Sequence, residues 1–201
     1  MAVGWLEGID TSMEFRPADA LGMSCGTVTL DLPRGRVLLI WNKQLRIHQL
    51  PKGRRNIDEP MLSAALRETY EETGIHVTPL RLNIATRATL PADEQSLYGR
   101  QEKNPDITDG RPSTEFIGAC LYPDPQSETE SLKTVFYYAA TADSTINPHT
   151  GTQEAWEKLE ARWVSIAEVA GTLYFQGEIA AVRKAVDDVK KTGYAIGGIG
   201  S

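Results

Sequence analysis

Strand-like patterns fill the first quarter of the chain. Residues 18–31 and 36–41 are rich in valine, leucine and isoleucine, and residues 32–35, Leu-Pro-Arg-Gly, have the composition of a turn. This pattern predicts two antiparallel strands joined by that turn. Residues 45–50 alternate between two faces, which favours a third strand, and Pro51 then ends regular pairing.

A helical period follows these strands. Asp58 suits the N-cap, Pro60 suits the first turn, and Gly74 suits the left-handed position that follows a helix. We therefore predict a helix that runs to Thr73. At about 100° per residue, its side chains divide into a core stripe and an opposite acidic face. The predicted core stripe holds Leu62, Leu66, Thr69 and Thr73, and the acidic face holds Glu68, Glu71 and Glu72.

The second half of the chain begins with a polar stretch. Residues 92–112 contain three turn-forming pairs with proline or glycine and show no period, which predicts a long loop. Further strands are predicted at residues 116–122, at residues 134–141 and around Trp163. The last helix is predicted at residues 177–191, with Glu178 near its start. Its apolar stripe holds Ile179, Val182, Val186 and Val189.

The composition is that of one ordinary globular domain, with 201 residues of which 41% are hydrophobic and 24% charged. No apolar run approaches the roughly 18 residues that a membrane span needs, so no membrane association is expected. Residues 1–15 lack a basic head followed by an apolar stretch, which favours a cytoplasmic location. A chain from which a secretion signal had been removed would look the same. Cys25 and Cys120 fit no metal or disulfide pattern and are interpreted as buried thiols.

Positive charge is concentrated just before the predicted helix. The net charge is −6, yet residues 32–57 contain no acidic residue and seven of the 21 lysines and arginines. This concentration favours a local field for an anion, although a solvated basic loop would have the same composition. The stretch is too narrow for non-specific nucleic-acid binding. The seven residues are Arg34, Arg36, Lys43, Arg46, Lys52, Arg54 and Arg55.

The spacing of the acidic residues carries the chemistry. Five residues separate Gly53 from Glu59, seven more follow, and residues 67–75 then read Arg-Glu-Thr-Tyr-Glu-Glu-Thr-Gly-Ile. This arrangement resembles the Nudix box at seven fixed identities, a coincidence of about 10⁻⁶ for a chain of ordinary composition. One position departs, because Thr69 stands where the family usually has an aliphatic residue. The threonine methyl group can still pack in the core stripe, so the departure changes little.

The chemistry of a phosphoanhydride explains the acidic residues. Its negative oxygens repel a nucleophile, and divalent ions neutralise that charge, orient the phosphates and acidify a bound water. Mg²⁺ and Mn²⁺ prefer carboxylate, carbonyl and water oxygens. Carboxylates at positions i, i+3 and i+4 converge on one face of a helix, which fixes their separation. Alone, three such residues would more often be a solvated acidic face; the surrounding box residues favour function.

The resemblance implies an α/β/α sandwich with a mixed sheet, in which the box forms a loop, a helix and a loop. It implies a hydrolase that cleaves a phosphoanhydride bond with Mg²⁺ or Mn²⁺. By the same resemblance, Glu68 and Glu72 would bind the metal. Glu71 would be a metal ligand or the base that activates water, and the backbone carbonyl of Lys52 would complete the metal site.

Two further box residues have expected roles. Arg67 lies one helical turn before Glu71, within reach of an ion pair that would hold this carboxylate. Glu59 would act structurally or through a second metal ion. We expect an N-terminal extension at residues 1–14, a Nudix domain at residues 15–195 with its box at residues 53–75, and a flexible tail at residues 196–201.

The substrate is suggested by two short resemblances outside the box. Residues 50–53, Leu-Pro-Lys-Gly, resemble the entry to the box in dinucleoside polyphosphate hydrolases and in fungal diphosphoinositol polyphosphate hydrolases. Residues 156–169 resemble the end of the latter enzymes. We therefore hypothesise a densely phosphorylated small molecule, with a diphosphoinositol polyphosphate favoured over a dinucleoside polyphosphate. The residues expected to surround it are Lys43, Arg46, Lys52, Arg54 and Arg55.

Alternatives remain open at this stage. Other Nudix substrates are capped RNA, nucleoside diphosphate derivatives and oxidised nucleotides, and capped RNA ends are the one form of nucleic acid that we would expect. A non-catalytic Nudix domain that senses a ligand is a different class of protein. Such domains usually lose box carboxylates, whereas this chain keeps all of them.

Overall fold

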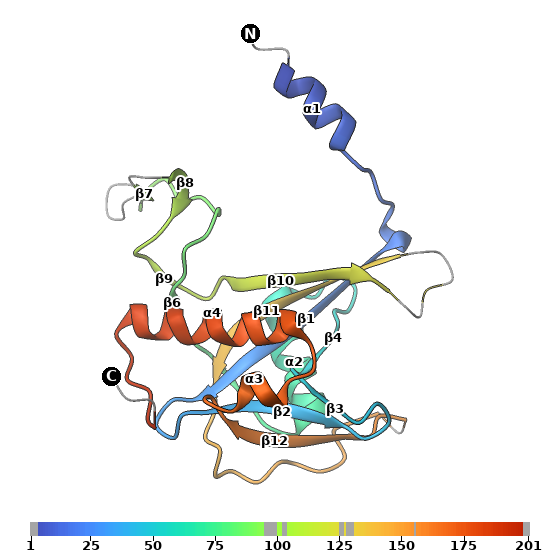
Figure 1. Cartoon of the computed structure of the whole chain (residues 1–201), viewed down its shortest axis with the longest axis vertical. Coiled ribbons are helices and arrows are strands. Elements are labelled where there is room, and N and C mark those ends of the chain that lie inside the picture. The colour runs from blue at the N-terminus through green and yellow to red at the C-terminus, as the bar shows by residue number, and fades with distance from the viewer. Residues whose placement is uncertain are drawn as a thin grey trace.

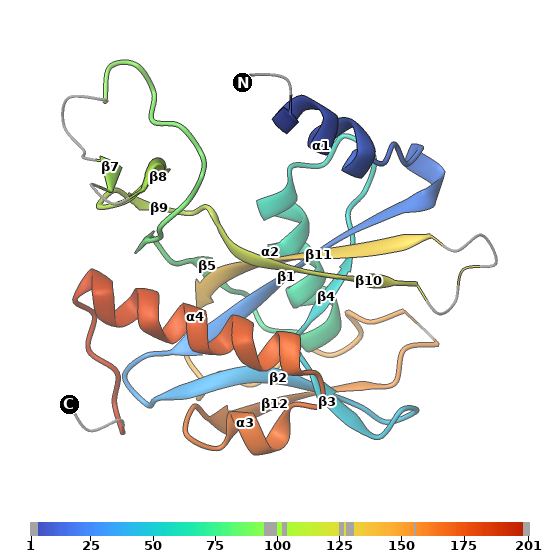
Figure 2. The same cartoon turned by 45° about the horizontal axis from the view of Figure 1, so that its top comes forward.

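The structure is a computed structural model that describes residues 4–94, 100–101, 104–124, 127, 131–154 and 156–198. A twisted mixed sheet has α4 (Gln176–Thr192) across one face and α2 (Met61–Thr73) against the other (Figures 1 and 2). The main hydrophobic core lies between α4 and the sheet, and a smaller one lies between α2 and the sheet. These three layers confirm the predicted α/β/α architecture.

The central sheet is eight-stranded in the described part of the chain. Its main path runs β10 (Phe116–Pro123), β11 (Leu132–Thr141), β1 (Leu21–Asp31), β2 (Arg36–Asn42) and β12 (Leu159–Ser165). Strand β1 pairs in parallel with β11, whereas the other pairs are antiparallel. The short strands beside this path are β3 (Ile47–Gln49) on β2, β4 (Lys52–Arg54) on β1 and β5 (Thr78–Pro79) on β11.

The remaining elements lie outside the central sheet. The predicted long loop at residues 92–112 instead contains short strands, so that prediction was wrong for its described residues; residues 95–99 and 102–103 lie outside them. Two small sheets join β6 (Leu82–Asn83) to β9 (Pro112–Ser113), and β7 (Arg100–Gln101) to β8 (Asn104–Thr108). The short helices are α1 (Gly4–Ser12), η1 (Ala18–Ala20) and α3 (Val169–Thr172). Helix α1 stands away from the sheet (Figure 1).

The two ends of helix α2 agree only in part with the prediction. Asp58 does not cap it: Asp58 has a positive φ of 61°, and the residue before the helix is Pro60. Gly74 ends the helix as predicted, in the left-handed conformation with a φ of 70°, and donates its N–H to the carbonyl oxygen of Tyr70. The third predicted strand is also shorter, because residues 43–46 form a turn.

The buried face of α2 differs from the predicted stripe. Thr69 and Thr73 are buried, but Leu66 is only half-buried, and Ala65 and Glu72 are buried instead. Small side chains suit this face because α2 lies directly against β1. The hydroxyl of Thr69 is 2.8 Å from that of Thr27 in β1, an interaction that favours threonine over the usual aliphatic residue. Leu66→Ala should therefore cost less than the 2–5 kcal/mol typical of a buried leucine.

Helix α4 follows the predicted stripe. Ile179, Val182, Val186 and Val189 are buried in the main core, which also buries the middle of β1 and β2. Gly193 ends this helix with a φ of 90°. Cys25 is a buried free thiol, as predicted, whereas Cys120 is a free thiol that is only half-buried. Among the described helices, none combines the length and hydrophobicity that crossing a bilayer requires.

Candidate active site

Arg67 joins the box carboxylates around one guanidinium group. Its Nε and Nη2 donate to the two carboxylate oxygens of Glu59, each at 2.8 Å. Its Nη1 donates at 2.7 Å to Glu68 and at 2.7 Å to Glu71. The hydrogen bonds from Arg67 lower the pKa of the Glu59 carboxyl, because they favour its charged form. The expected contact between Arg67 and Glu71 is therefore present, within a larger network.

Gly53 makes room for one of these carboxylates. A Cβ atom built on Gly53 would overlap the carboxylate of Glu68. Because glycine has no side chain at this position of β4, the Glu68 carboxylate can lie against the strand. The Glu68 side chain is 14% exposed. Burial raises the pKa of its carboxyl, with Arg67 opposing that effect. The first glycine of the box thus has a direct steric role.

Glu72 and Glu71 have opposite environments. Glu72 is buried at 6% exposure, and one of its carboxylate oxygens accepts the backbone N–H of Lys52 at 2.8 Å. Burial raises the pKa of Glu72 to about 8. The Glu71 side chain is 42% exposed and reaches solvent beside Arg67. The sequence had suggested that the three glutamates share one exposed face. In the structure they do not, because Glu72 is buried and Glu71 is exposed.

A further acidic residue, Glu157, is grouped here with Glu68 and Glu72 as the acidic cluster. Its negative charge adds to the upward shift of the pKa of both carboxyls, behind the larger effect of burial. The backbone N–H of Glu154 donates to the Glu157 carboxylate at 3.2 Å. The spacing of the box does not reveal Glu157, because this residue lies in the segment before β12, far along the chain from the box.

The donor chemistry of this cluster fits a hard divalent cation. Carboxylates of Glu68, Glu72 and Glu157, with the backbone of Lys52 beside them, are the oxygen donors that Mg²⁺ and Mn²⁺ prefer. Within the described residues, no three acidic, histidine or cysteine side chains lie close enough together to hold a metal ion as they stand. Arg67 holds Glu68 and Glu71 instead, so a bound cation would compete with its ion pairs.

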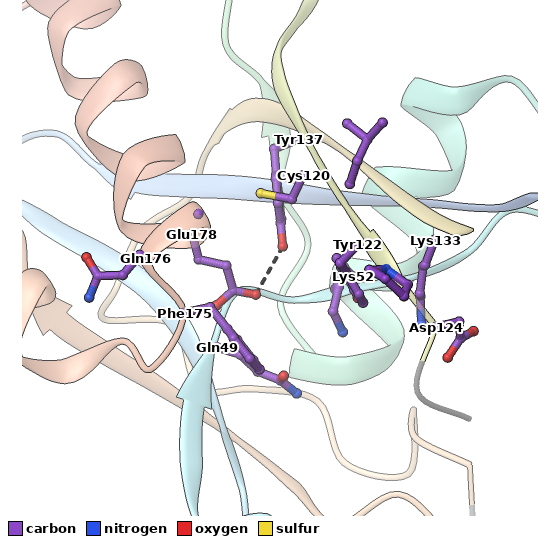
Figure 3. Close-up of a pocket in the computed structure, with 13 residues that line it drawn as sticks. Gln49, Lys52, Cys120, Tyr122, Asp124, Lys133, Tyr137, Phe175, Gln176 and Glu178 are labelled. Atoms are coloured by element: carbon purple, nitrogen blue, oxygen red, sulfur yellow. Dashed lines mark hydrogen bonds between the residues drawn. The ribbon is translucent and has the colours of Figure 1, made fainter. Parts of the chain in front are cut away.

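A cavity of about 520 Å³ is lined by residues that include Lys52 (Figure 3). Lys52 connects this cavity to the acidic cluster, because its side chain lines the cavity while its backbone N–H donates to Glu72. Lys133 of β11 lies near Lys52, and Phe175 lies on the other side of the cavity before α4. The lining of the cavity includes Gln49, Lys52, Tyr122, Lys133, Phe175 and Glu178.

Glu178 is a buried acid at the floor of this cavity. Its two carboxylate oxygens accept hydrogen bonds from the backbone N–H of Leu50 at 3.1 Å and from the hydroxyl of Tyr137 at 3.0 Å. Burial raises the pKa of the Glu178 carboxyl to about 7. The sequence indicated only a residue near the start of the last helix; its placement depends on pairing between distant strands.

The raised pKa of Glu178 predicts a pH-dependent stability. Below about pH 4.5 both folded and unfolded chains hold this proton, and between about 4.5 and about 7 only the folded chain does. The contribution of Glu178 is therefore fully present below pH 4.5 and is lost as the pH rises through 7. In thermal melts from pH 5 to 8, Glu178→Gln should gain stability relative to the unmodified protein. A constant difference between the two proteins would contradict this assignment.

The five basic residues predicted to bind substrate do not all line the cavity. Lys52 does. Arg54 is exposed on β4, and Arg55 donates to the backbone oxygen of Glu59 at 2.7 Å. Lys43 and Arg46 are exposed in the turn between β2 and β3. The Lys43 ammonium pairs with Glu160 at 3.5 Å. The second lysine that lines the cavity is Lys133. The sequence did not indicate this residue, because it lies 81 positions after Lys52.

Comparisons with known proteins support the same fold and box. A family model described as NUDIX domain matches residues 22–183. Similar solved structures include a NUDIX hydrolase from Nitrosomonas europaea, with 13% identity, a TM-score of 0.51, and coverage of 87% of this chain and 91% of that chain. A C. elegans Ap4A hydrolase binary complex has 15% identity, a TM-score of 0.53, and coverage of 85% and 98%.

A hydrolase of the NUDIX family from Clostridium perfringens has 17% identity, a TM-score of 0.53, and coverage of 85% of this chain and 97% of that chain. A search of curated proteins gave no match. At these identities the solved structures show a common fold, whereas the family model rests on the sequence itself and spans most of the chain.

Proposed function

This chain belongs to the NUDIX domain family and is a pyrophosphohydrolase, and from that premise we propose that its substrate is a dinucleoside polyphosphate. The cavity beside Glu72 carries the proposal. The rings of Tyr122 and Phe175 line it and suit stacking with a nucleobase. Lys52 and Lys133 lie on the side toward the acidic cluster, where they suit phosphate oxygens.

The same cavity favours this substrate over a diphosphoinositol polyphosphate, which the sequence had favoured. An inositol pyrophosphate carries many phosphates and needs several cations around it. Of the described residues that line the cavity, two are lysines and two, Asp124 and Glu178, are acidic. Lys43 is paired with Glu160, and Arg46 lies outside the cavity lining. A diphosphoinositol polyphosphate remains the second candidate, supported by the basic stretch itself.

The residues have distinct parts in the proposed reaction. Glu68, Glu72, Glu157 and the backbone carbonyl of Lys52 would hold Mg²⁺ or Mn²⁺. The bound cation would neutralise phosphate charge and acidify a water molecule. A carboxylate oxygen of Glu71, which faces solvent, would accept the proton of the attacking water. Arg67 would keep Glu71 in place, and the Lys52 and Lys133 ammonium groups would hold the phosphates that are not cleaved.

A substrate panel tests this proposal. With Mg²⁺ present, kcat/KM should be highest for a dinucleoside polyphosphate among inositol pyrophosphates, capped RNA, oxidised nucleotides and nucleoside diphosphate derivatives. Phe175→Ala should raise the KM for the dinucleoside polyphosphate by about tenfold, because one stacked base contributes about 1–3 kcal/mol. It should leave the KM for an inositol pyrophosphate nearly unchanged.

Arg46→Ala is the matched control, because Arg46 is exposed outside the cavity lining. It should alter neither KM. The opposite pattern, with inositol pyrophosphate as the best substrate and a larger loss from Arg46→Ala than from Phe175→Ala, would reject the proposal. Binding of a nucleotide with no turnover of any panel member would instead identify a non-catalytic sensor.

A further inference from the structure

The segment between β11 and β12 supplies hydrogen-bond donors to the C-terminal end of α2. The hydroxyl of Thr152 donates to the backbone oxygen of Glu71 at 2.9 Å, and the side-chain amide of Gln153 donates to that of Glu72 at 2.9 Å. The backbone N–H of His149 donates to the Gly74 oxygen at 2.8 Å. The last carbonyls of a helix have no partner within it, so these donors complete the end of α2.

The Gln153 amide also holds the beginning of β12. Its nitrogen donates to the Leu159 backbone oxygen at 3.1 Å, and its oxygen accepts the Leu159 N–H at 3.3 Å. One side chain therefore links the helix that carries Glu72 to the strand start beside Glu157. Gln153 thus joins the backbone of Glu72 to that of Leu159, two residues after Glu157.

We propose that Gln153 and Thr152 are positioning residues that set the metal affinity of the acidic cluster. This inference rests on the proposed function, in which Glu68, Glu72 and Glu157 hold the cation. Glu68 and Glu72 are like charges one helical turn apart in α2, so they repel one another when no cation is bound. Gln153 ties the end of this helix to the start of β12 and so limits how the backbone can respond.

The chemistry of these contacts suits such a role. Thr152 and Gln153 bind the backbone oxygens of Glu71 and Glu72 and not their carboxylates. Each glutamate can thus turn toward a cation while its backbone stays in place. Groups that support metal ligands in this indirect way typically change metal affinity or activity by 10–100-fold when they are removed. A smaller effect is expected for Thr152, because its hydroxyl contacts α2, whereas Gln153 contacts both α2 and β12.

Manganese binding to the substrate-free protein tests the proposal. Gln153→Met keeps the length of the side chain and removes its donors, and it should weaken Mn²⁺ binding by about tenfold, measured by electron paramagnetic resonance of free Mn²⁺. The kcat at low Mg²⁺ should fall and recover at high Mg²⁺, while the substrate KM stays constant. Thr152→Val should weaken Mn²⁺ binding by a smaller factor, and Thr152→Ser, which keeps the hydroxyl, should restore it.

Thr192→Val is the matched control at another helix end. The Thr192 hydroxyl donates to the Asp188 backbone oxygen in α4 and accepts the N–H of Asn83, outside the acidic cluster. Its loss should lower the melting temperature and leave Mn²⁺ affinity unchanged. Unchanged Mn²⁺ affinity in folded Gln153→Met, or in Thr152→Val if the former does not fold, would overturn the inference. An unmodified protein that binds no Mn²⁺ would instead overturn the proposed function.

Discussion

Glu72→Gln is expected to lower kcat by about a hundredfold or more while the protein still folds. Glu72 is a buried carboxylate in the acidic cluster, and the loss of its charge removes a ligand from the proposed cation site. A bound cation stabilises transition-state charge by several kcal/mol, and a loss of about 3 kcal/mol corresponds to about a hundredfold in rate. The amide oxygen of glutamine can still accept the N–H of Lys52, the contact that Glu72 makes now. The variant should therefore lose catalytic rate and keep its fold.

Stability separates this variant from a damaged protein. Because burial raises the pKa of Glu72 to about 8, its contribution to stability without metal is lost as the pH rises from about 4.5 through 8. In a chelator at pH 8, Glu72→Gln should therefore melt at a higher temperature than the unmodified protein. Added Mg²⁺ should stabilise the unmodified protein and have little effect on the variant.

Glu71→Gln gives the comparison within the same helix. Glu71 is far more exposed, so its substitution should leave the melting temperature in chelator almost unchanged. Its kcat should still fall by about a hundredfold if Glu71 accepts the proton from water. Near-normal turnover by both variants at saturating Mg²⁺ would reject the roles given to these residues.

The box was predictable because its information is local. A fixed spacing along one helix identified Arg67 and the three glutamates, and Gly74 ended that helix as its sequence required. The orientation of the helix was not predictable, since it depends on β1. Small residues and the contact of Thr69 with Thr27 turn Ala65 and Glu72 inward, although leucines elsewhere on the helix are more hydrophobic.

The cavity beside Lys52 was not predictable from local sequence patterns. Lys133 and Glu178 reach it through the parallel pairing of β1 with β11 and the packing of α4, contacts between segments far apart in the chain. The basic stretch suggested a single binding surface. This was misleading, because residues that are close in sequence point to different places around a hairpin turn. Lys43 lies in that turn, whereas Lys52 lies beyond it in β4 and enters the cavity.

Gly53→Ala is expected to lower kcat by about a hundredfold through one added methyl group. The φ angle of Gly53 is not positive, so alanine can adopt the backbone conformation. Its Cβ atom would overlap the Glu68 carboxylate, which must then move away from β4. A misplacement of about 1 Å in a catalytic group can cost about 10²-fold in rate. Because the displaced atoms end a flexible side chain, the fold should be nearly as stable as before.

Two other glycines provide matched controls for this prediction. At Gly26 a Cβ atom would overlap the Pro51 backbone oxygen, so Gly26→Ala should lower the melting temperature strongly. At Gly171 a Cβ atom meets nothing within 4 Å, so Gly171→Ala should change neither stability nor kcat. Mn²⁺ titration should show weaker binding to Gly53→Ala than to Gly171→Ala, since a ligand has moved. If Gly53→Ala kept full activity, Glu68 would not need its position against β4, and its assignment as a metal ligand would fall.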